Sequence, residues 1–312
     1  MNTNILKSVR WNLRIVLIIV LSLIFYFVQP IQSSKVIYIP KGSIKSIITH
    51  LNHTGYTLSI LDEYLLRFIG VPQHGWIDIG DTKLSRADFL YALTHSKAHT
   101  VDIMLVPGET TIIFFDQIAK KLHLNSKKLY KLFVKYSPIK EGVLIPETYS
   151  LPYNISEEQT VRLLLNSSIK LHRERSYKIL GEYLEKKWFQ YVTIASIIEK
   201  EAASKKEMPI ISSVIYNRLK KRMRLQMDGT LNYGKYSHVK VTSKRIKRDK
   251  STYNTYKYAG IPPIPVCNVS FSAIKAAIYP KKTNYLYFVK SKNGTHRFNR
   301  YYNSHLKYIN SH

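Results

Sequence analysis

Residues 191–208 read YVTIASIIEKEAASKKEM, the stretch with the most informative helical pattern in the chain. Ile194, Ile197 and Ile198 recur at helical spacing and predict a helix that starts with this stretch. Glu201 follows Ile194 at i+7, so its carboxyl continues the same apolar face. A carboxyl at the end of an apolar face is partly desolvated, and desolvation raises its pKa. A raised pKa is what a general acid needs near neutral pH.

A second interpretation of Glu201 is purely structural. Lys205 follows it at i+4, where the two side chains would form an ion pair on the helix surface. The spacing alone leaves both interpretations open.

Downstream of this helix, the sequence is rich in groups that suit a carbohydrate. A helix is predicted over residues 212–219, and polar and aromatic residues follow it. Amide, carboxyl and hydroxyl groups match sugar hydroxyls, and aromatic rings match the apolar faces of pyranoses. The same residue types are common in turns. The expected groove-lining residues are Gln226, Asp228, Thr230, Tyr233, Tyr253 and Asn254.

The flanking segments alternate between helices and short strands. Helical spacing recurs over 111–122, 127–134 and 161–188, with an irregular, proline-containing stretch from 137 to 153. Residues 270–278 predict a further helix. Residues 285–289 are the clearest strand, and Asn293-Gly294 predicts a hairpin that returns the chain through 296–298.

Residues 30–105 predict a small α+β module. Val36–Ile39 is a β-branched and aromatic run, and Ser43 is placed to cap a helix that follows it. Ser85 has capping-box spacing before another helix, and residues 101–106 predict a strand. The pattern fits an ordinary packing module and a carbohydrate-binding module equally well.

The N-terminus predicts a membrane anchor. Residues 15–28 contain no charge and would span about 21 Å as a helix, against about 30 Å for a hydrocarbon core. Arg10 and Arg14 precede the run and can reach one membrane interface. A cleaved signal peptide is the alternative, although no clear small-residue cleavage site follows. We expect a cytoplasmic tail over 1–14, an anchor over 15–29 and the remaining chain outside the cytoplasm.

Composition restricts the function classes. The 312 residues carry 48 Lys and Arg against 20 Asp and Glu, so the net charge of +28 predicts an anionic partner. Hydrophobic residues make up 45% of the chain, which excludes a disordered polycation. The single cysteine, Cys267, excludes an internal disulfide and a cysteine-rich zinc site. His95 and His99 have no third ligand nearby in the sequence, so we expect neither a metal nor a cofactor.

One basic segment has three interpretations. Residues 235–250 hold seven Lys or Arg and one Asp. A solvated loop, attraction to the carboxylates of cell-wall peptides, and nucleic-acid binding all fit such a segment. A protein outside the cytoplasm argues against nucleic acid, so we expect none as a partner.

From residue 194 onward the sequence resembles the endolytic murein transglycosylases of the YceG-like family. Pro146-Glu147-Thr148-Tyr149 resembles the family's Pro-Asp-Thr-Tyr segment, and the N-terminal module resembles its LysM-like subdomain more loosely. In chain order, the matching residues are Ala195-Ser196-Ile197-Ile198-Glu199-Lys200-Glu201, Asn217-Arg218-Leu219, Met223-Arg224-Leu225-Gln226, Asp228, Thr230, Tyr233-Gly234, Tyr253-Asn254-Thr255-Tyr256, Gly260, Pro262-Pro263, Pro265, Asn268, Pro280, 285–289 and His296.

The resemblance implies an α+β protein with a single transmembrane helix, a LysM-like module over 30–105 and a catalytic domain over 106–312 with its core at 190–312. It implies cleavage of the β-1,4 bond between N-acetylmuramic acid and N-acetylglucosamine within glycan strands, leaving 1,6-anhydromuramic ends. The family's catalytic acid is the second Glu of its Glu-Lys-Glu segment, here Glu201, whereas Glu199 is expected to be structural. The expected partners are peptidoglycan and the penicillin-binding proteins that build new glycan. The expected location is the cytoplasmic membrane, with the catalytic domain on its outer side.

The chain departs from the family pattern at several places. Gly229 replaces the Pro of an Asp-Pro-Thr triplet, Ala202 replaces a frequent Thr, and Met208 stands where Arg is usual. Two other function classes stay open. A muramidase-type hydrolase would need a second carboxylate, for which Asp228 is the candidate. A wall-binding or division scaffold would not need Glu201.

Overall fold

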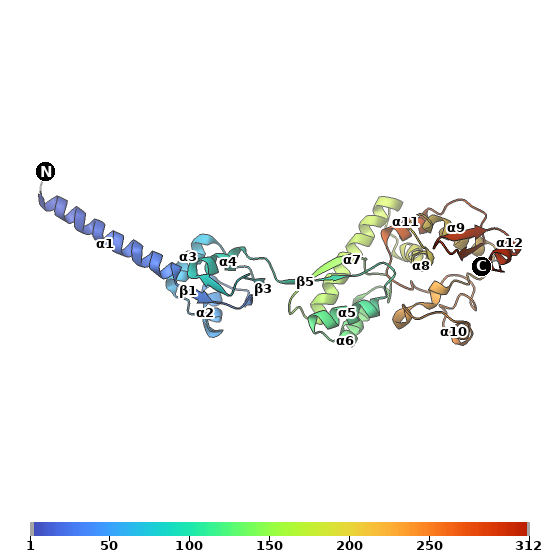
Figure 1. Cartoon of the computed structure of the whole chain (residues 1–312), viewed down its shortest axis with the longest axis horizontal. Helices are drawn as coiled ribbons and strands as arrows, with labels where there is room; N and C mark the ends of the chain where they lie inside the picture. The colour runs from blue at the N-terminus through green and yellow to red at the C-terminus, as the bar shows by residue number, and fades with distance from the viewer. Residues whose placement is uncertain (1–2, 311–312) are drawn as a thin grey trace. The chain divides into compact units, whose positions relative to one another are not determined.

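The structure, a computed structural model that describes residues 3–310, is an α+β protein with two compact units (Figure 1). Unit 1 is Met1–Thr100 with Pro152–Asn154, and unit 2 is Val101–Leu151 with Ile155–His312. The sequence predicts this boundary after residue 105. It lies earlier because strand β5 (Thr100–Met104) pairs with β6 (Thr148–Pro152) and buries Ile103 in the core of unit 2. Residues 1–2 of the expected cytoplasmic tail lie outside the described residues.

Helix α1 (Thr3–Val28) is longer than the uncharged run from which it was predicted. Its segment Ser8–Val28 is 21 residues long, or about 32 Å of helix, which matches the thickness of a hydrocarbon core. In the described part of the chain, this is the one helix that is long and apolar enough to cross a membrane.

The rest of unit 1 is built from two two-stranded antiparallel sheets and three helices. Ile47, Leu66, Ile77 and Phe89 are among the residues of its apolar core. The elements are β1 (Pro30–Gln32), β2 (Val36–Ile39), α2 (Ile44–His53), α3 (Ile60–Ile69), β3 (Gly75–Asp78), β4 (Lys83–Ser85) and α4 (Arg86–His95). Strand β1 pairs with β4 and β2 with β3, with Val36 opposite Asp78. The predicted N-caps are confirmed, because Ser43 caps α2 and Ser85 caps α4.

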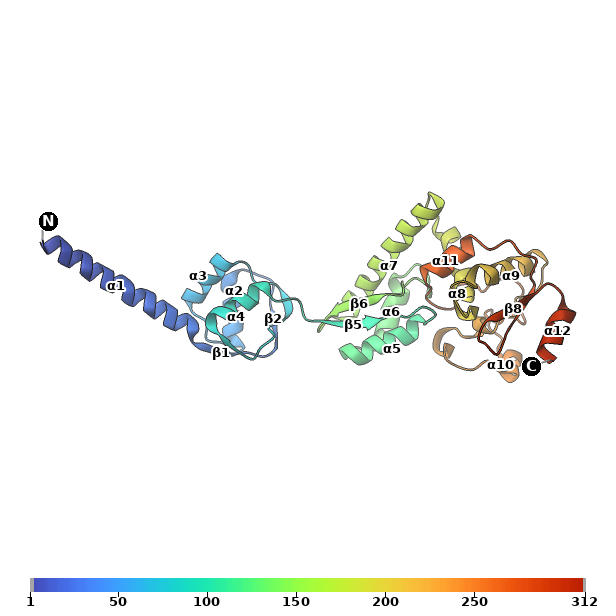
Figure 2. The same ribbon diagram turned by 45° about the horizontal axis from the view of Figure 1, so that its top comes forward.

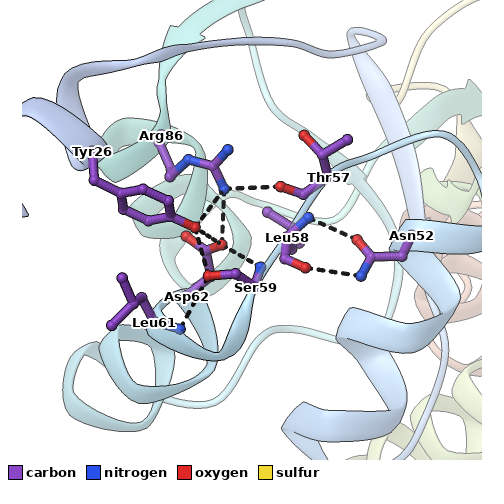
Figure 3. A network of polar contacts seen from close by, with 8 residues as sticks. All are labelled: Tyr26, Asn52, Thr57, Leu58, Ser59, Leu61, Asp62 and Arg86. Carbon is purple, nitrogen blue, oxygen red and sulfur yellow. Dashed lines mark hydrogen bonds and ion pairs between the residues drawn. The ribbon is translucent and has the colours of Figure 1, made fainter.

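A buried polar cluster joins the end of α1 to the rest of unit 1 (Figure 3). The Tyr26 hydroxyl lies 2.6 Å from the hydroxyl of Ser59 and donates to Asp62 Oδ2 at 2.8 Å. Arg86 donates to the same Asp62 oxygen at 2.8 Å and to the Thr57 carbonyl at 2.9 Å. Asp62 is fully buried, so the Arg86 guanidinium compensates a charge that water does not reach. The last turn of α1 is therefore part of the folded unit.

Unit 2 is organised around one buried helix, α8, which packs against α9 and α11 (Figure 2). Its helices are α5 (Thr111–Leu122), α6 (Ser126–Tyr136), α7 (Glu157–Leu180), α8 (Glu185–Glu201), α9 (Met208–Lys220), α10 (Ser243–Arg248), α11 (Phe271–Ile278) and α12 (Tyr302–Asn310). Two 3-10 turns, η1 (Asp228–Leu231) and η2 (Gly234–Tyr236), follow α9. Strands β7 (Tyr287–Lys290) and β8 (His296–Asn299) form the predicted hairpin, with Tyr287 opposite Asn299.

In place of the single helix expected over 161–188, the structure has two, α7 and α8. Gly181 adopts a left-handed conformation with φ of 74° and donates its N–H to the Tyr177 carbonyl, ending α7. The chain turns and α8 begins at Glu185. His172 of α7 then holds α8 in place, because it accepts a hydrogen bond from the Trp188 indole at 3.0 Å and contacts the Val143 carbonyl at 2.9 Å.

Candidate active site

Glu201 is the last residue of α8, at the point where the buried helix reaches a cleft. Its Oε1 accepts a hydrogen bond of 2.7 Å from the backbone N–H of Gly229. Burial raises the pKa of the Glu201 carboxyl to about 7, the Gly229 N–H opposes the shift, and the negative charge of Asp228 adds to it. Glu201 can therefore hold a proton near neutral pH and release it within the same range.

The surface pairing of Glu201 with Lys205 does not hold. Helix α8 ends at Glu201 and Ala202 is extended, so residue 205 is not one helical turn away. The carboxyl faces the cleft and the η1 turn instead.

Two motif segments from different parts of the chain form one wall of the cleft. The Gln226 N–H donates to the Thr255 carbonyl at 3.1 Å, and the Met227 N–H donates to the Thr255 hydroxyl at 3.1 Å. The Thr230 and Thr255 hydroxyls lie 2.9 Å apart. These bonds fix the start of η1, and with it the Gly229 N–H that reaches Glu201.

The cleft has a volume of about 530 Å³ and joins this wall to the β7–α12 region. Its lining combines acidic, amide, aromatic and basic side chains, which suits a polar ligand with apolar faces. The lining residues are Glu201, Arg218, Leu225, Gln226, Met227, Asp228, Tyr256, Tyr287, Phe288, Val289, Tyr302 and His305.

Of the predicted site residues, Glu201, Gln226 and Asp228 lie together in this cleft. Asp228 is exposed, and its Oδ1 accepts a hydrogen bond of 2.7 Å from the Tyr256 hydroxyl. Gln226 has a left-handed backbone with φ of 49°. Its Oε1 lies 3.4 Å from the Arg218 guanidinium, which is a donor.

The structure corrects two expected groove contacts. Thr230 and Asn254 are both fully buried. Thr230 donates to the Met227 carbonyl at 2.7 Å, and the Asn254 amide donates to the carbonyls of Ile246 and Asp249. Both residues therefore support the loops that build the cleft and do not reach its surface.

The two predicted tyrosines lie beside the cleft rather than in its lining. Tyr233 and Tyr253 stack on each other with centroids 4.3 Å apart. Tyr233 faces a separate hollow of about 740 Å³, into which the basic residues Lys240, Lys244 and Arg248 also face. The basic segment noted in the sequence thus borders a concave surface next to the tyrosine pair.

Sequence reasoning missed the residues that hold and close the cleft. Arg218 donates to the carbonyls of Leu286 at 2.6 Å and Leu225 at 2.9 Å, so it ties the residue before β7 to the opposite wall. The sequence did offer a signal for Arg218, because this residue lies in the motif Asn217-Arg218-Leu219. The ring of His305 stacks on that of Tyr287 with centroids 5.4 Å apart, and the sequence offered no signal for it, because no motif residue lies in α12.

Two further motif residues have structural partners. Glu199 accepts hydrogen bonds from the N–H and the hydroxyl of Ser270, at 2.8 and 2.6 Å, and so supports the start of α11. His296 binds Glu207 through its backbone N–H and through Nδ1, both at 2.8 Å, which fixes β8 to the start of α9. Neither residue faces the cleft.

A family model and several named proteins are similar to this chain. The model of the YceG-like family matches residues 37–311. Proteins named endolytic murein transglycosylase from Bacillus subtilis (strain 168) and Streptococcus pneumoniae (strain ATCC BAA-255 / R6) are 38% and 32% identical over 170 and 157 residues. These alignments cover 54% and 48% of this chain but only 46% and 28% of the relatives' own lengths.

The similarity to a solved structure extends over a longer part of the chain than these alignments. The crystal structure of a YceG-like protein from Listeria monocytogenes has a TM-score of 0.57 and 28% identity. The alignment covers 90% of this chain and 99% of the Listeria chain. The chain belongs to the YceG-like family.

Proposed function

We propose that this protein is an endolytic lytic transglycosylase of peptidoglycan, with Glu201 as its acid and base. The observation that carries the proposal is the Glu201 carboxyl, whose pKa burial raises to about 7 at the edge of a polar and aromatic cleft. The names of the Bacillus and Streptococcus relatives support the substrate and the reaction class.

The proposed reaction needs one carboxyl group. Protonated Glu201 gives its proton to the glycosidic oxygen between N-acetylmuramic acid and N-acetylglucosamine as the bond from C1 to that oxygen breaks. The C6 hydroxyl of the same muramic residue then bonds to C1 and passes its proton to the Glu201 carboxylate. The product is a 1,6-anhydromuramic end, and Glu201 is again protonated. The Gly229 N–H stabilises the carboxylate between the two proton transfers.

A hydrolase is the second candidate, and one observation favours it. Asp228 is exposed in the same cleft as Glu201, where a second carboxylate could activate water or attack C1 directly. The Tyr256 hydroxyl donates to Asp228, which holds its carboxylate in one orientation.

We further propose that α1 anchors the protein in the cytoplasmic membrane with unit 2 on the outer side, near enzymes that synthesise glycan. Its 21-residue apolar segment supports the anchor. Unit 1 is proposed to be LysM-like, which the strand–helix–helix–strand order from β2 to β3 supports.

The test is digestion of purified peptidoglycan by the full chain in detergent, followed by mass spectrometry of the fragments. Three proteins are compared: the native chain, Glu201→Gln, and Glu174→Gln as a control at an exposed carboxylate of α7. Anhydro-ended fragments from the native and control proteins, and none from Glu201→Gln, are expected. Reducing ends would favour a hydrolase. The absence of cleavage by the folded native protein would favour a wall-binding scaffold.

A further inference from the structure

Helix α3 presents an apolar stripe to its surroundings. Phe68 is 90% exposed and Val71, just beyond the helix, is 73% exposed. Tyr64 precedes them at helical spacing, and Ile60 and Leu61 lie one turn before it; all three are exposed. A stripe of this length on one face of a helix is typical of a binding surface, whereas single exposed apolar residues are ordinary.

The opposite face of α3 packs into unit 1, so the helix carries apolar side chains on both its buried and its exposed face. Leu66 is fully buried in the core of the unit, and Asp62 is fully buried in the cluster of Figure 3. Glu63, the other acidic residue of the helix, is largely covered and pairs with Arg67. The exposed stripe therefore carries no free carboxylate, and the same helix presents the exposed guanidinium of Arg67.

The position of α3 is set by the end of the apolar helix α1. Ser59 caps α3, and its hydroxyl lies 2.6 Å from the Tyr26 hydroxyl, two residues before α1 ends. Asp62, in the first turn of α3, accepts a second bond from Tyr26 at 2.8 Å. Because α3 has ten residues and a length of about 15 Å, its whole outer face remains close to the end of α1.

We propose that this stripe of Ile60, Leu61, Tyr64, Phe68 and Val71 lies in the lipid headgroup region of the membrane leaflet at which α1 ends. Aromatic and aliphatic side chains are stabilised at that depth, and Arg67 can pair with anionic lipid headgroups. This proposal depends on the membrane anchoring by α1 that is proposed above. It makes unit 1 a second point of membrane contact, so that the module is held against the bilayer in a fixed orientation.

The experiment uses the full chain in lipid nanodiscs of phosphatidylethanolamine and phosphatidylglycerol. A fluorophore is attached at Phe68→Cys or, as the matched control, at Thr49→Cys, an exposed position on α2. The native Cys267 is fully buried, and the chain without an introduced cysteine measures any labelling there. Quenching by nitroxide groups on the lipid acyl chains and by aqueous iodide is compared between the two sites.

We expect the label at position 68 to be quenched several-fold more by the lipid nitroxides than by iodide, and the label at position 49 to show the reverse. A second possible result is protein that co-purifies with the discs and yet shows equal iodide quenching at positions 68 and 49. That result contradicts lipid contact by the stripe but agrees with anchoring by α1. Protection at position 68 from both quenchers indicates a protein contact and also overturns it. Failure to co-purify with the discs overturns the anchor and the surface together.

Discussion

The carboxyl Oε1 of Glu201 accepts a 2.7 Å hydrogen bond from the backbone N–H of Gly229, which lies 28 residues later in the chain. A Cβ at position 229 would come within 2.9 Å of that oxygen and 2.5 Å of Lys200 Cβ, so the approach requires glycine. The family pattern that this sequence resembles has Pro here, which carries no N–H. Glycine at position 229 therefore supplies Glu201, the proposed acid, with an N–H donor that proline lacks.

Gly229→Ala is predicted to displace the Glu201 carboxyl or the η1 turn. Activity on peptidoglycan should fall about 100-fold, the usual loss for a small misplacement of a catalytic group. The measurement is the rate of release of soluble fragments by the folded variant.

Gly181→Ala is the matched control. Gly181 ends α7 with a positive φ, and a Cβ there would meet no atom within 4 Å. It should lower stability by about 1 kcal/mol and leave the rate nearly unchanged. Equal losses in the two variants would contradict a specific role for Gly229.

The pH dependence of cleavage follows from the pKa of Glu201. The reaction starts from the protonated carboxyl, so kcat/KM should fall about tenfold per pH unit above a pKa of about 7. A rate that instead rose steadily from pH 6 to pH 9 would show that Glu201 does not act as the acid.

Asp228→Asn separates the two proposed reactions. The negative charge of Asp228 helps to raise the pKa of Glu201, so removing it lowers that pKa and moves the falling limb of the pH profile to lower pH. A transglycosylase should retain cleavage with this shifted profile. Loss of all cleavage in a folded Asp228→Asn variant would favour the hydrolase.

Glu201→Gln is predicted to stabilise the protein while it abolishes cleavage. The pKa of Glu201 rises from an ordinary value of 4.5 to about 7 on folding, so the folded state binds the proton more tightly. The native free energy of unfolding therefore falls as pH rises from 4.5 to 7, and the loss is complete above that range. Because Glu201 as a residue is partly exposed at the cleft, we expect the variant to gain about 1 to 3 kcal/mol at pH 8 and little at pH 4. Denaturant unfolding at the two pH values, with Glu174→Gln as control, measures the difference; a gain independent of pH would contradict the cause.

Asp62→Ala is predicted to destabilise unit 1. It leaves the Arg86 guanidinium buried without its carboxylate, which costs about 3 kcal/mol, and removes the bond to Tyr26. Hydrogen exchange of the α2, α3 and α4 amides measures the effect within this unit. Asp81→Ala, at an exposed residue between β3 and β4, should change the exchange little; similar increases would contradict a special role for the buried pair.

The regular elements of the fold could be predicted because local signals determine them. The β2 strand, the caps at Ser43 and Ser85, helix α5 and the β7–β8 hairpin all follow from spacing, capping residues and turn chemistry. The prediction lacks the break at Gly181 because the helical pattern continues on both sides of it, although a glycine there is a signal for a helix end.

The site could be predicted in part. Glu201 could be identified because the helical spacing of the isoleucines before it places its carboxyl on their apolar face. Gln226 and Asp228 lie in loops that reach the cleft. Thr230 and Asn254 carry the same kinds of polar groups, but hydrogen bonds to the nearby carbonyls of Met227 and Ile246 hold them inside the folded loops, where both are fully buried. The wall formed by Tyr287 and His305 depends on the packing of α12, which no motif records.

The most direct test of the central claim, that Glu201 promotes attack by the substrate's own C6 hydroxyl, is digestion in water enriched in heavy oxygen. Mass spectrometry then measures whether the new glycan ends contain heavy oxygen. We predict anhydro ends without heavy oxygen, formed by the native protein and not by Glu201→Gln. New ends that each carry one heavy oxygen atom would contradict the account and establish hydrolysis.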